Sequence, residues 1–252
     1  MPPKTGDAML ARLAFAALLL AAAASNALAG QANLGGVSIR LPPPAGFCEL
    51  SASNDSDKRM ITVLGDLLQK SGNKLLAMSA DCRQLSDWHT GKRQLLDDYA
   101  QYQTAIAGMD KPPSETIAET CNTLREEGNK ILANQLPDIK KRVETTLSNI
   151  KMNETSFLGV LGENNEACYA GLIQKIHTEA NTDKTQITVF AISTVKNRSV
   201  FTYRFTVYQN QQTVEATLNK IKIDIAALIV ANGGRAPADQ GNTGNSLPSS
   251  RK

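Results

Sequence analysis

The sequence predicts an α+β fold, in which a largely antiparallel sheet is packed by a long helix and by a C-terminal amphipathic helix. Residues 199–232 have the pattern of one strand followed by one helix, and residues 117–150 keep a helical spacing of apolar side chains. Between them lies a series of strand-like runs with short, turn-like joins, which predicts an antiparallel meander. The runs are 157–161, 168–177, 186–195 and 199–208.

The most regular strand is 199–208. Its aromatic residues Phe201, Tyr203 and Phe205 alternate with the polar residues Thr202 and Arg204. Successive side chains of a strand point to opposite faces, so this pattern predicts a half-buried strand with one wet face.

A helix follows this strand from Gln211. Its apolar residues recur at steps of three and four, which predicts a helix with one buried stripe. The sequence Asn232-Gly233-Gly234 supplies the stop. The stripe consists of Val214, Leu218, Ile221, Ile225, Leu228 and Ile229.

The first half of the chain predicts shorter elements. A strand at 37–41 ends at a run of three prolines, a helix begins at about Asp57, and a second strand covers 74–80. We expect these two strands to be parallel neighbours across the helix, with a further strand at 97–104.

The long helical segment 117–150 contains Gly128 and Pro137. A proline inside a helix costs about 3 kcal/mol, so we expect two helices or one kinked helix. Packing on the sheet is the favoured arrangement, and a coiled-coil seam that forms a homodimer is the alternative.

The N-terminus predicts export. Lys4 and Arg12 precede an apolar run from Leu13 to Ala24, and Ala27-Leu28-Ala29 fits a cleavage site. The run is too short for an ordinary membrane-spanning helix, so no membrane span is expected after cleavage. We therefore expect a signal peptide at 1–29, a single α+β domain at 30–232, a disordered tail at 233–252, and a periplasmic or secreted location.

All four cysteines lie in the expected mature chain. An even count in an oxidising compartment favours two disulfides, and the sequence alone leaves three pairings open. We favour Cys48–Cys82 and Cys121–Cys168, because the first two would both lie near the carboxyl ends of the two strands expected to be parallel.

The charge and the motifs exclude several classes of function. The formal net charge is +3 over 252 residues, which gives no electrostatic argument for a nucleic-acid partner. The chain has no phosphate-binding loop, no dinucleotide-binding glycine pattern, no zinc-protease motif and no serine-hydrolase elbow. No cofactor and no metal site is expected.

One segment stands out as a candidate ligand site. Trp88, His89, Arg93 and Tyr99 lie on an expected loop and strand, where they could hold a flat or anionic ligand by stacking and charge. The alternative is that Trp88 is a core residue below a loop. The adjacent acids at 97–98 are expected to be a solvated edge, because neighbouring strand residues point to opposite faces.

The segment VFAISTVKNRSVFTYRFTVY, followed by QQTVEATLNKIKIDIAALIVAN, resembles part of the PsbP-like α/β/α sandwich. The chain is also similar to small exported proteins of alphaproteobacteria with no assigned function, in a G-F-C-E-L segment and in an A-D-C at Cys82. The resemblance covers 37–232 in outline and includes no catalytic motif. It implies a binding or assembly factor, and no functional residue carries over from it.

The sequence thus supports two main hypotheses. The first is an exported, disulfide-stapled, non-enzymatic binding or assembly accessory protein of the bacterial envelope, whose partner is an unknown envelope protein or a small ligand. The second is a periplasmic hydrolase that uses His89 as its base, with Asp87 or Asp97.

Overall fold

The computed structural model describes residues 30–147, 150–178 and 183–235. The expected signal peptide at 1–29 and nearly all of the expected tail lie outside these ranges, so both remain predictions. None of the helices in the described ranges combines the length and the hydropathy of a membrane-spanning helix.

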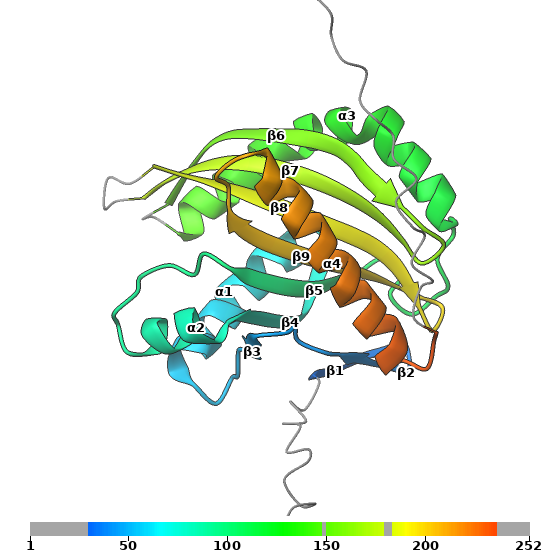
Figure 1. Cartoon of the computed structure of the whole chain (residues 1–252), viewed down its shortest axis with the longest axis horizontal. Helices are drawn as coiled ribbons and strands as arrows, with labels where there is room; N and C mark the ends of the chain where they lie inside the picture. The colour runs from blue at the N-terminus through cyan, green and yellow to red at the C-terminus, as the bar shows by residue number, and fades with distance from the viewer. Residues whose placement is uncertain (1–29, 148–149, 179–182, 236–252) are drawn as a thin grey trace, which may run out of the picture.

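Within these ranges, seven strands form one antiparallel sheet in the order β3-β4-β5-β9-β8-β7-β6 (Figure 1). This confirms the α+β class. Consecutive hairpins join β6 to β9, as the predicted meander requires, and β5 of the first half pairs with β9. The strands are β3 (Phe47–Glu49), β4 (Asn73–Asp81), β5 (Tyr99–Ala105), β6 (Ile150–Glu163), β7 (Ala167–Thr178), β8 (Asp183–Val195) and β9 (Arg198–Val207).

A separate two-stranded sheet holds the strand predicted at 37–41. This strand, β2 (Val37–Leu41), pairs with β1 (Gly30–Leu34), which the sequence did not predict. The expected parallel pairing of 37–41 with 74–80 is wrong, because β4 takes antiparallel partners on both sides. Gly35 and Gly36 have φ of 56° and 82°, the left-handed backbone that lets this tight hairpin close.

Strand β9 is covered on both faces, which corrects the predicted wet face. Thr202 is 1% and Arg204 is 7% exposed, whereas the aromatic residues of the other face are partly buried. The reason is the strand's place in the sheet: β9 lies between β5 and β8, below α4. A polar alternation in a central strand therefore marks a buried polar face.

Helix α4 (Gln211–Ala231) crosses β8 and β9 on one face of the sheet (Figure 1). Most of its predicted stripe is buried. Ile221, Ile225 and Leu228 are fully covered, whereas Leu218 and Ile229 are partly buried against the core. The helix ends at the predicted stop, where Asn232 exchanges two hydrogen bonds with the backbone of Arg40 in β2. The small β1–β2 sheet is thereby fixed to the end of α4.

Three helices lie on the opposite face of the sheet (Figure 1). α1 (Asp55–Lys70) covers β4, and α2 (Cys82–His89) follows β4 directly. α2 occupies residues expected to form a loop. Its N-cap is Asp81, whose carboxylate accepts hydrogen bonds from the N–H groups of Arg83 and Gln84.

α3 (Ile117–Thr146) is one continuous helix that includes Pro137 and packs mainly on β6. It begins with a capping box between Thr116 and Glu119. It therefore corresponds to the single-helix alternative, and its packing is the expected one of a helix on a sheet.

Two disulfides link the helical layer to the sheet. Cys48 of β3 pairs with Cys82, and Cys121 of α3 pairs with Cys168 of β7. The predicted pairing is confirmed. The expected parallel geometry at the first pair is wrong. Cys48 lies on β3, which is the antiparallel neighbour of β4, and Phe47 lies opposite Asp81.

Two helical glycines provide a matched test of packing. A Cβ at Gly128 would lie 2.3 Å from Cε1 of Phe157, whereas a Cβ at Gly65 would meet no atom within 4 Å. Gly65→Ala should raise the free energy of unfolding by about 0.5–1 kcal/mol, because alanine favours the helix. Gly128→Ala should lower it by about 1–2 kcal/mol, because the phenyl ring must move. Urea unfolding measures both, and equal effects would contradict the close contact of α3 with β6.

Candidate functional site

Trp88 and His89 both lie on α2, but Trp88 has apolar neighbours and His89 has a charged partner. Trp88 packs against the small core cluster of Leu50, Met78, Ala80, Leu85 and Leu96, below α1 and α2. The Nε2 atom of His89 lies 2.5 Å from Oδ1 of Asp57, which is buried near the start of α1. This contact ties the end of α2 to α1.

Arg93 and Tyr99 have other partners again. Arg93 donates to Oδ2 of Asp97 at 2.7 Å. The ring of Tyr99 stacks on Phe205 of β9, with ring centroids 4.2 Å apart. The four predicted residues thus lie in one region, with Trp88 and Tyr99 on the same core cluster, while their polar groups contact separate partners. Ligand binding by them remains a prediction.

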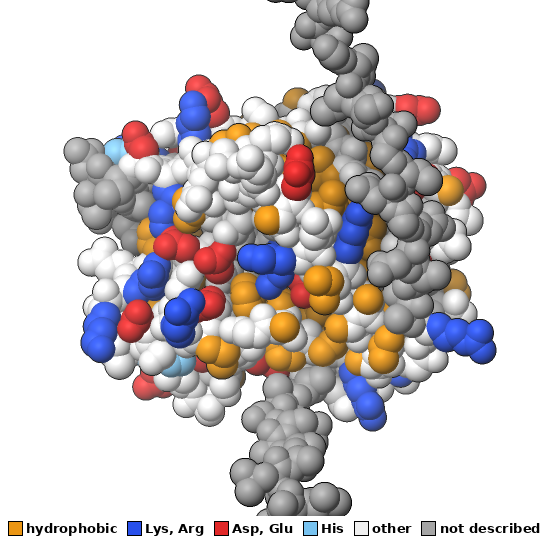
Figure 2. All heavy atoms as spheres, in the orientation of Figure 1, with side chains coloured by type: hydrophobic (Ala, Val, Ile, Leu, Met, Phe, Trp, Pro, Cys, Tyr) orange, Lys and Arg blue, Asp and Glu red, His pale blue; other side chains and the backbone are white. Residues whose placement is uncertain are grey.

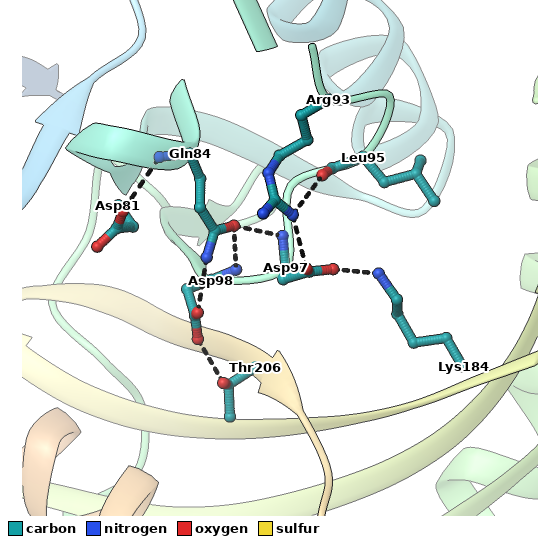
Figure 3. A network of polar contacts seen from close by, with 8 residues as sticks. All are labelled: Asp81, Gln84, Arg93, Leu95, Asp97, Asp98, Lys184 and Thr206. Atoms are coloured by element: carbon teal, nitrogen blue, oxygen red, sulfur yellow. Dashed lines mark hydrogen bonds and ion pairs between the residues drawn. The ribbon is translucent and has the colours of Figure 1, made fainter. Parts of the chain in front are cut away.

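The acids at 97–98 lie just before β5 in a polar network, which corrects the expected solvated edge (Figure 3). The side-chain oxygen of Gln84 accepts hydrogen bonds from the N–H groups of both Asp97 and Asp98. Asp98 in turn accepts from the amide of Gln84 and from the hydroxyl of Thr206. The network therefore joins α2, the start of β5 and β9.

Within this network, Asp97 forms ion pairs with Arg93 and Lys184. Burial raises its pKa, but hydrogen bonds and charges from Lys184 and Arg93 outweigh burial, and the pKa lies below its usual value. Asp97 is therefore held as a carboxylate between α2 and β8.

A small pocket opens beside this network, on the α4 face of the sheet. Its volume is about 110 Å³. It lies where β3 and β5 begin and β4 and β9 end, next to Thr217 and Lys220 of α4. It is lined by Phe47, Asp81, Asp98, Arg204, Phe205, Thr206, Thr217 and Lys220.

Arg204 is the unusual residue of this pocket. Its side chain is 8% exposed, and its guanidinium carbon lies 4.6 Å from the centre of the Phe47 ring. Its charged partner is Asp224 of α4, with Nε and Oδ2 3.3 Å apart. Oδ2 of Asp224 is buried without a hydrogen bond, whereas the nitrogens of Arg204 are not among the buried unpaired atoms of the described residues. Arg204 thus lines the pocket with a largely buried side chain and with Asp224 as its ion-pair partner.

The pKa of Asp224 reflects the same environment. Burial raises the pKa to about 6, against the opposing charges of Arg204 and Lys220. The ion pair is therefore incompletely compensated inside the fold.

Sequence reasoning did not find this site. Its residues come from positions as distant as Phe47 and Lys220, which no motif connects. One signal was present, since Asp224 falls within the apolar stripe of α4, between Ile221 and Ile225. A charge at a core position of a helix indicates a buried partner.

Comparisons with known proteins give little further information. No family model matches the chain, and no curated protein matches it. One solved structure that the chain resembles is the Ran-binding protein Mog1p of Saccharomyces cerevisiae, at 10% identity and a TM-score of 0.29. The match covers 80% of this chain and 86% of that one. A likeness at this TM-score carries no argument about fold or function, and the PsbP-like resemblance remains an expectation.

The raised pKa of Asp224 predicts a pH dependence of stability. Because the folded protein binds a proton here that the unfolded chain releases, the stabilising contribution is present at low pH and is lost as pH rises from about 4 to about 6. The free energy of unfolding of the wild type relative to Asp224→Asn should therefore fall across this window, by up to about 3 kcal/mol. Urea unfolding at several pH values measures it.

Asp138→Asn is the matched control for loss of a carboxylate, since the Asp138 side chain is 75% exposed on α3. A free energy of unfolding of the wild type that rises with pH relative to that of Asp224→Asn would contradict the raised pKa of the buried Asp224.

Proposed function

We propose that this chain is an exported, disulfide-stapled, non-enzymatic binding protein of the bacterial envelope, and that its ligand carries a carboxylate or a similar oxyanion into the Arg204 pocket. The observation that carries the binding proposal is Arg204, whose charged side chain lines a pocket although it is only 8% exposed and has Asp224 as its ion-pair partner.

The energetics of a buried arginine support binding. Taking a charge out of water costs several kcal/mol unless close partners compensate it. Asp224 offers one contact at 3.3 Å, and Phe47 offers a cation–π contact. An oxyanion in the pocket would supply acceptors to Arg204, because a guanidinium and a carboxylate match in a planar, paired geometry.

Export is supported by the disulfides together with the expected signal peptide. Cys48–Cys82 and Cys121–Cys168 use all four cysteines of the sequence, and such bonds persist in oxidising compartments. Export predicts that protein from the periplasmic fraction starts at Gly30 and carries both disulfides. Intact mass spectrometry, with and without reduction and alkylation, tests this. Four free thiols or an uncleaved N-terminus would contradict it.

The binding proposal predicts a saturable response to small anions. In titrations with acetate, glycine and inorganic phosphate, followed by NMR, at least one should shift the Nε–H signal of Arg204 to saturation. Arg204→Lys should weaken that binding by about tenfold or more, because lysine lacks the planar donor pair.

Two further variants keep this test decisive if Arg204→Lys is unstable. Lys220→Met removes a second cation from the pocket wall and should also weaken binding. Lys222→Met is the matched control, since Lys222 is on the same helix over the ring of Tyr169 and outside the pocket. Absence of binding by acetate, glycine and phosphate alike, or equal effects of the Lys220 and Lys222 variants, would overturn the proposal.

A hydrolase remains the second candidate because of one observation. His89 contacts the buried carboxylate of Asp57, and such a pair can orient an imidazole that acts as a base. The partner differs from the Asp87 or Asp97 expected from the sequence. A broad esterase, phosphatase and peptidase screen with the wild type and His89→Ala tests it. An activity that survives His89→Ala would eliminate His89 as the base.

A further inference from the structure

The walls of the Arg204 pocket carry charges of both signs, on the face of the molecule that carries α4, where acidic and basic side chains lie next to each other (Figure 2). Asp81 at the end of β4 and Asp98 before β5 form an acidic wall. Arg204 of β9 and Lys220 of α4 form a basic wall. Asp81 and Asp98 are both bonded to Gln84 of α2, and Asp98 also contacts Thr206 of β9, whereas Lys220 comes from α4, which packs on β9.

We infer that the ligand of this pocket is a small zwitterion, whose carboxylate binds Arg204 and Lys220 and whose ammonium group binds Asp81 and Asp98. This inference rests on the proposed function, since it names the ligand class of the same site. The chemical class includes free amino acids with small side chains and related amino acids with a short spacer.

The acidic wall has capacity for an ammonium group. Asp98 accepts hydrogen bonds from Gln84 and from Thr206, and Asp81 accepts two from the first turn of α2. A carboxylate has about four acceptor positions, so each acid retains room for a further donor. Their existing bonds fix the orientation of both carboxylates before a ligand arrives.

Charge balance favours a zwitterion over a single charge. A simple anion at Arg204 would lie near two carboxylates, and a simple cation would lie near two basic groups. Each of these would meet like charge across a narrow pocket, whereas a dipolar ligand meets an opposite charge at both ends.

The size of the pocket limits the ligand further. Its volume is about 110 Å³. Pockets for larger metabolites typically have about 300 Å³ or more. A ligand as small as glycine, alanine or β-alanine is therefore the size that the walls admit.

The test is a titration series with purified protein that begins at Gly30 and retains both disulfides. Glycine, L-alanine and β-alanine are the zwitterions, acetate and propionate are the anions, and N-acetylglycine keeps the carboxylate without the ammonium group. Calorimetry or NMR shifts give each dissociation constant. At least one zwitterion should bind about tenfold or more tighter than acetate and N-acetylglycine.

Variants separate the two walls. Asp98→Asn keeps the shape of the side chain and removes its charge, so it should weaken zwitterion binding while acetate binding stays equal or improves. Lys220→Met should weaken both. Asp87→Asn is the matched control, because Asp87 lies on α2 and outside the pocket, and it should change neither.

The outcomes distinguish this inference from the proposed function. If N-acetylglycine or acetate binds as tightly as glycine and depends on Lys220, the zwitterion inference fails while anion binding stands. If no anion and no zwitterion binds, both fail. If Asp98→Asn leaves the preference for zwitterions intact, the acidic wall does not recognise the ammonium group and the inference is overturned.

Discussion

The pairing of β5 with β9 holds this fold together. It joins residues 99–103 to residues 201–205, and so connects the first half of the chain to the C-terminal meander in one sheet. Side chains reinforce it at both ends: Tyr99 stacks on Phe205, and the hydroxyl of Thr104 donates to the carbonyl of Ser199. Contacts this distant in sequence require closure of a long loop, so they form only when the rest of the sheet can stabilise them.

The same pairing builds the pocket. Because Tyr99 lies opposite Phe205, Asp98 comes next to Thr206 and close to Arg204. α4 then places Asp224 against Arg204, on the face of β9 that also carries the buried residues Val200 and Thr202. A buried ion pair contributes little to stability compared with apolar residues of the same volume. Here Oδ2 of Asp224 is also buried without a hydrogen bond, and such local conflicts are found at functional sites.

Periodicity predicted the elements whose pattern comes from their own neighbours. The meander, the stripe of α4 and its stop at Asn232 all follow from side chains a few residues apart. The prediction that one face of β9 is exposed to solvent was wrong. Alternation shows that the two faces of a strand differ, but it does not show what covers each face. Arg204 looks like a solvated residue until α4 is placed over it.

The pocket itself lies beyond such reasoning. Asp98 precedes β5 and Arg204 lies in the last strand of the meander, far along the sequence. Only the register of β5 with β9 brings them together. For Trp88 and His89, the short helix α2 was missed because its cap, Asp81, ends the preceding strand directly. A segment without a linker offers no composition change to mark the boundary.

The Cys48–Cys82 disulfide gives the pocket its rigidity. Phe47, which stacks on Arg204, precedes Cys48, and Asp81, which lines the acidic wall, precedes Cys82. These two pocket residues are also opposite partners in the register of β3 with β4. Strand β3 has three residues and lies at the edge of the sheet, so its backbone bonds alone hold it weakly. The disulfide fixes this short strand covalently, and thereby keeps Phe47 and Asp81 of the pocket in place, so that the proposed ligand would lose less entropy on binding than at a mobile site.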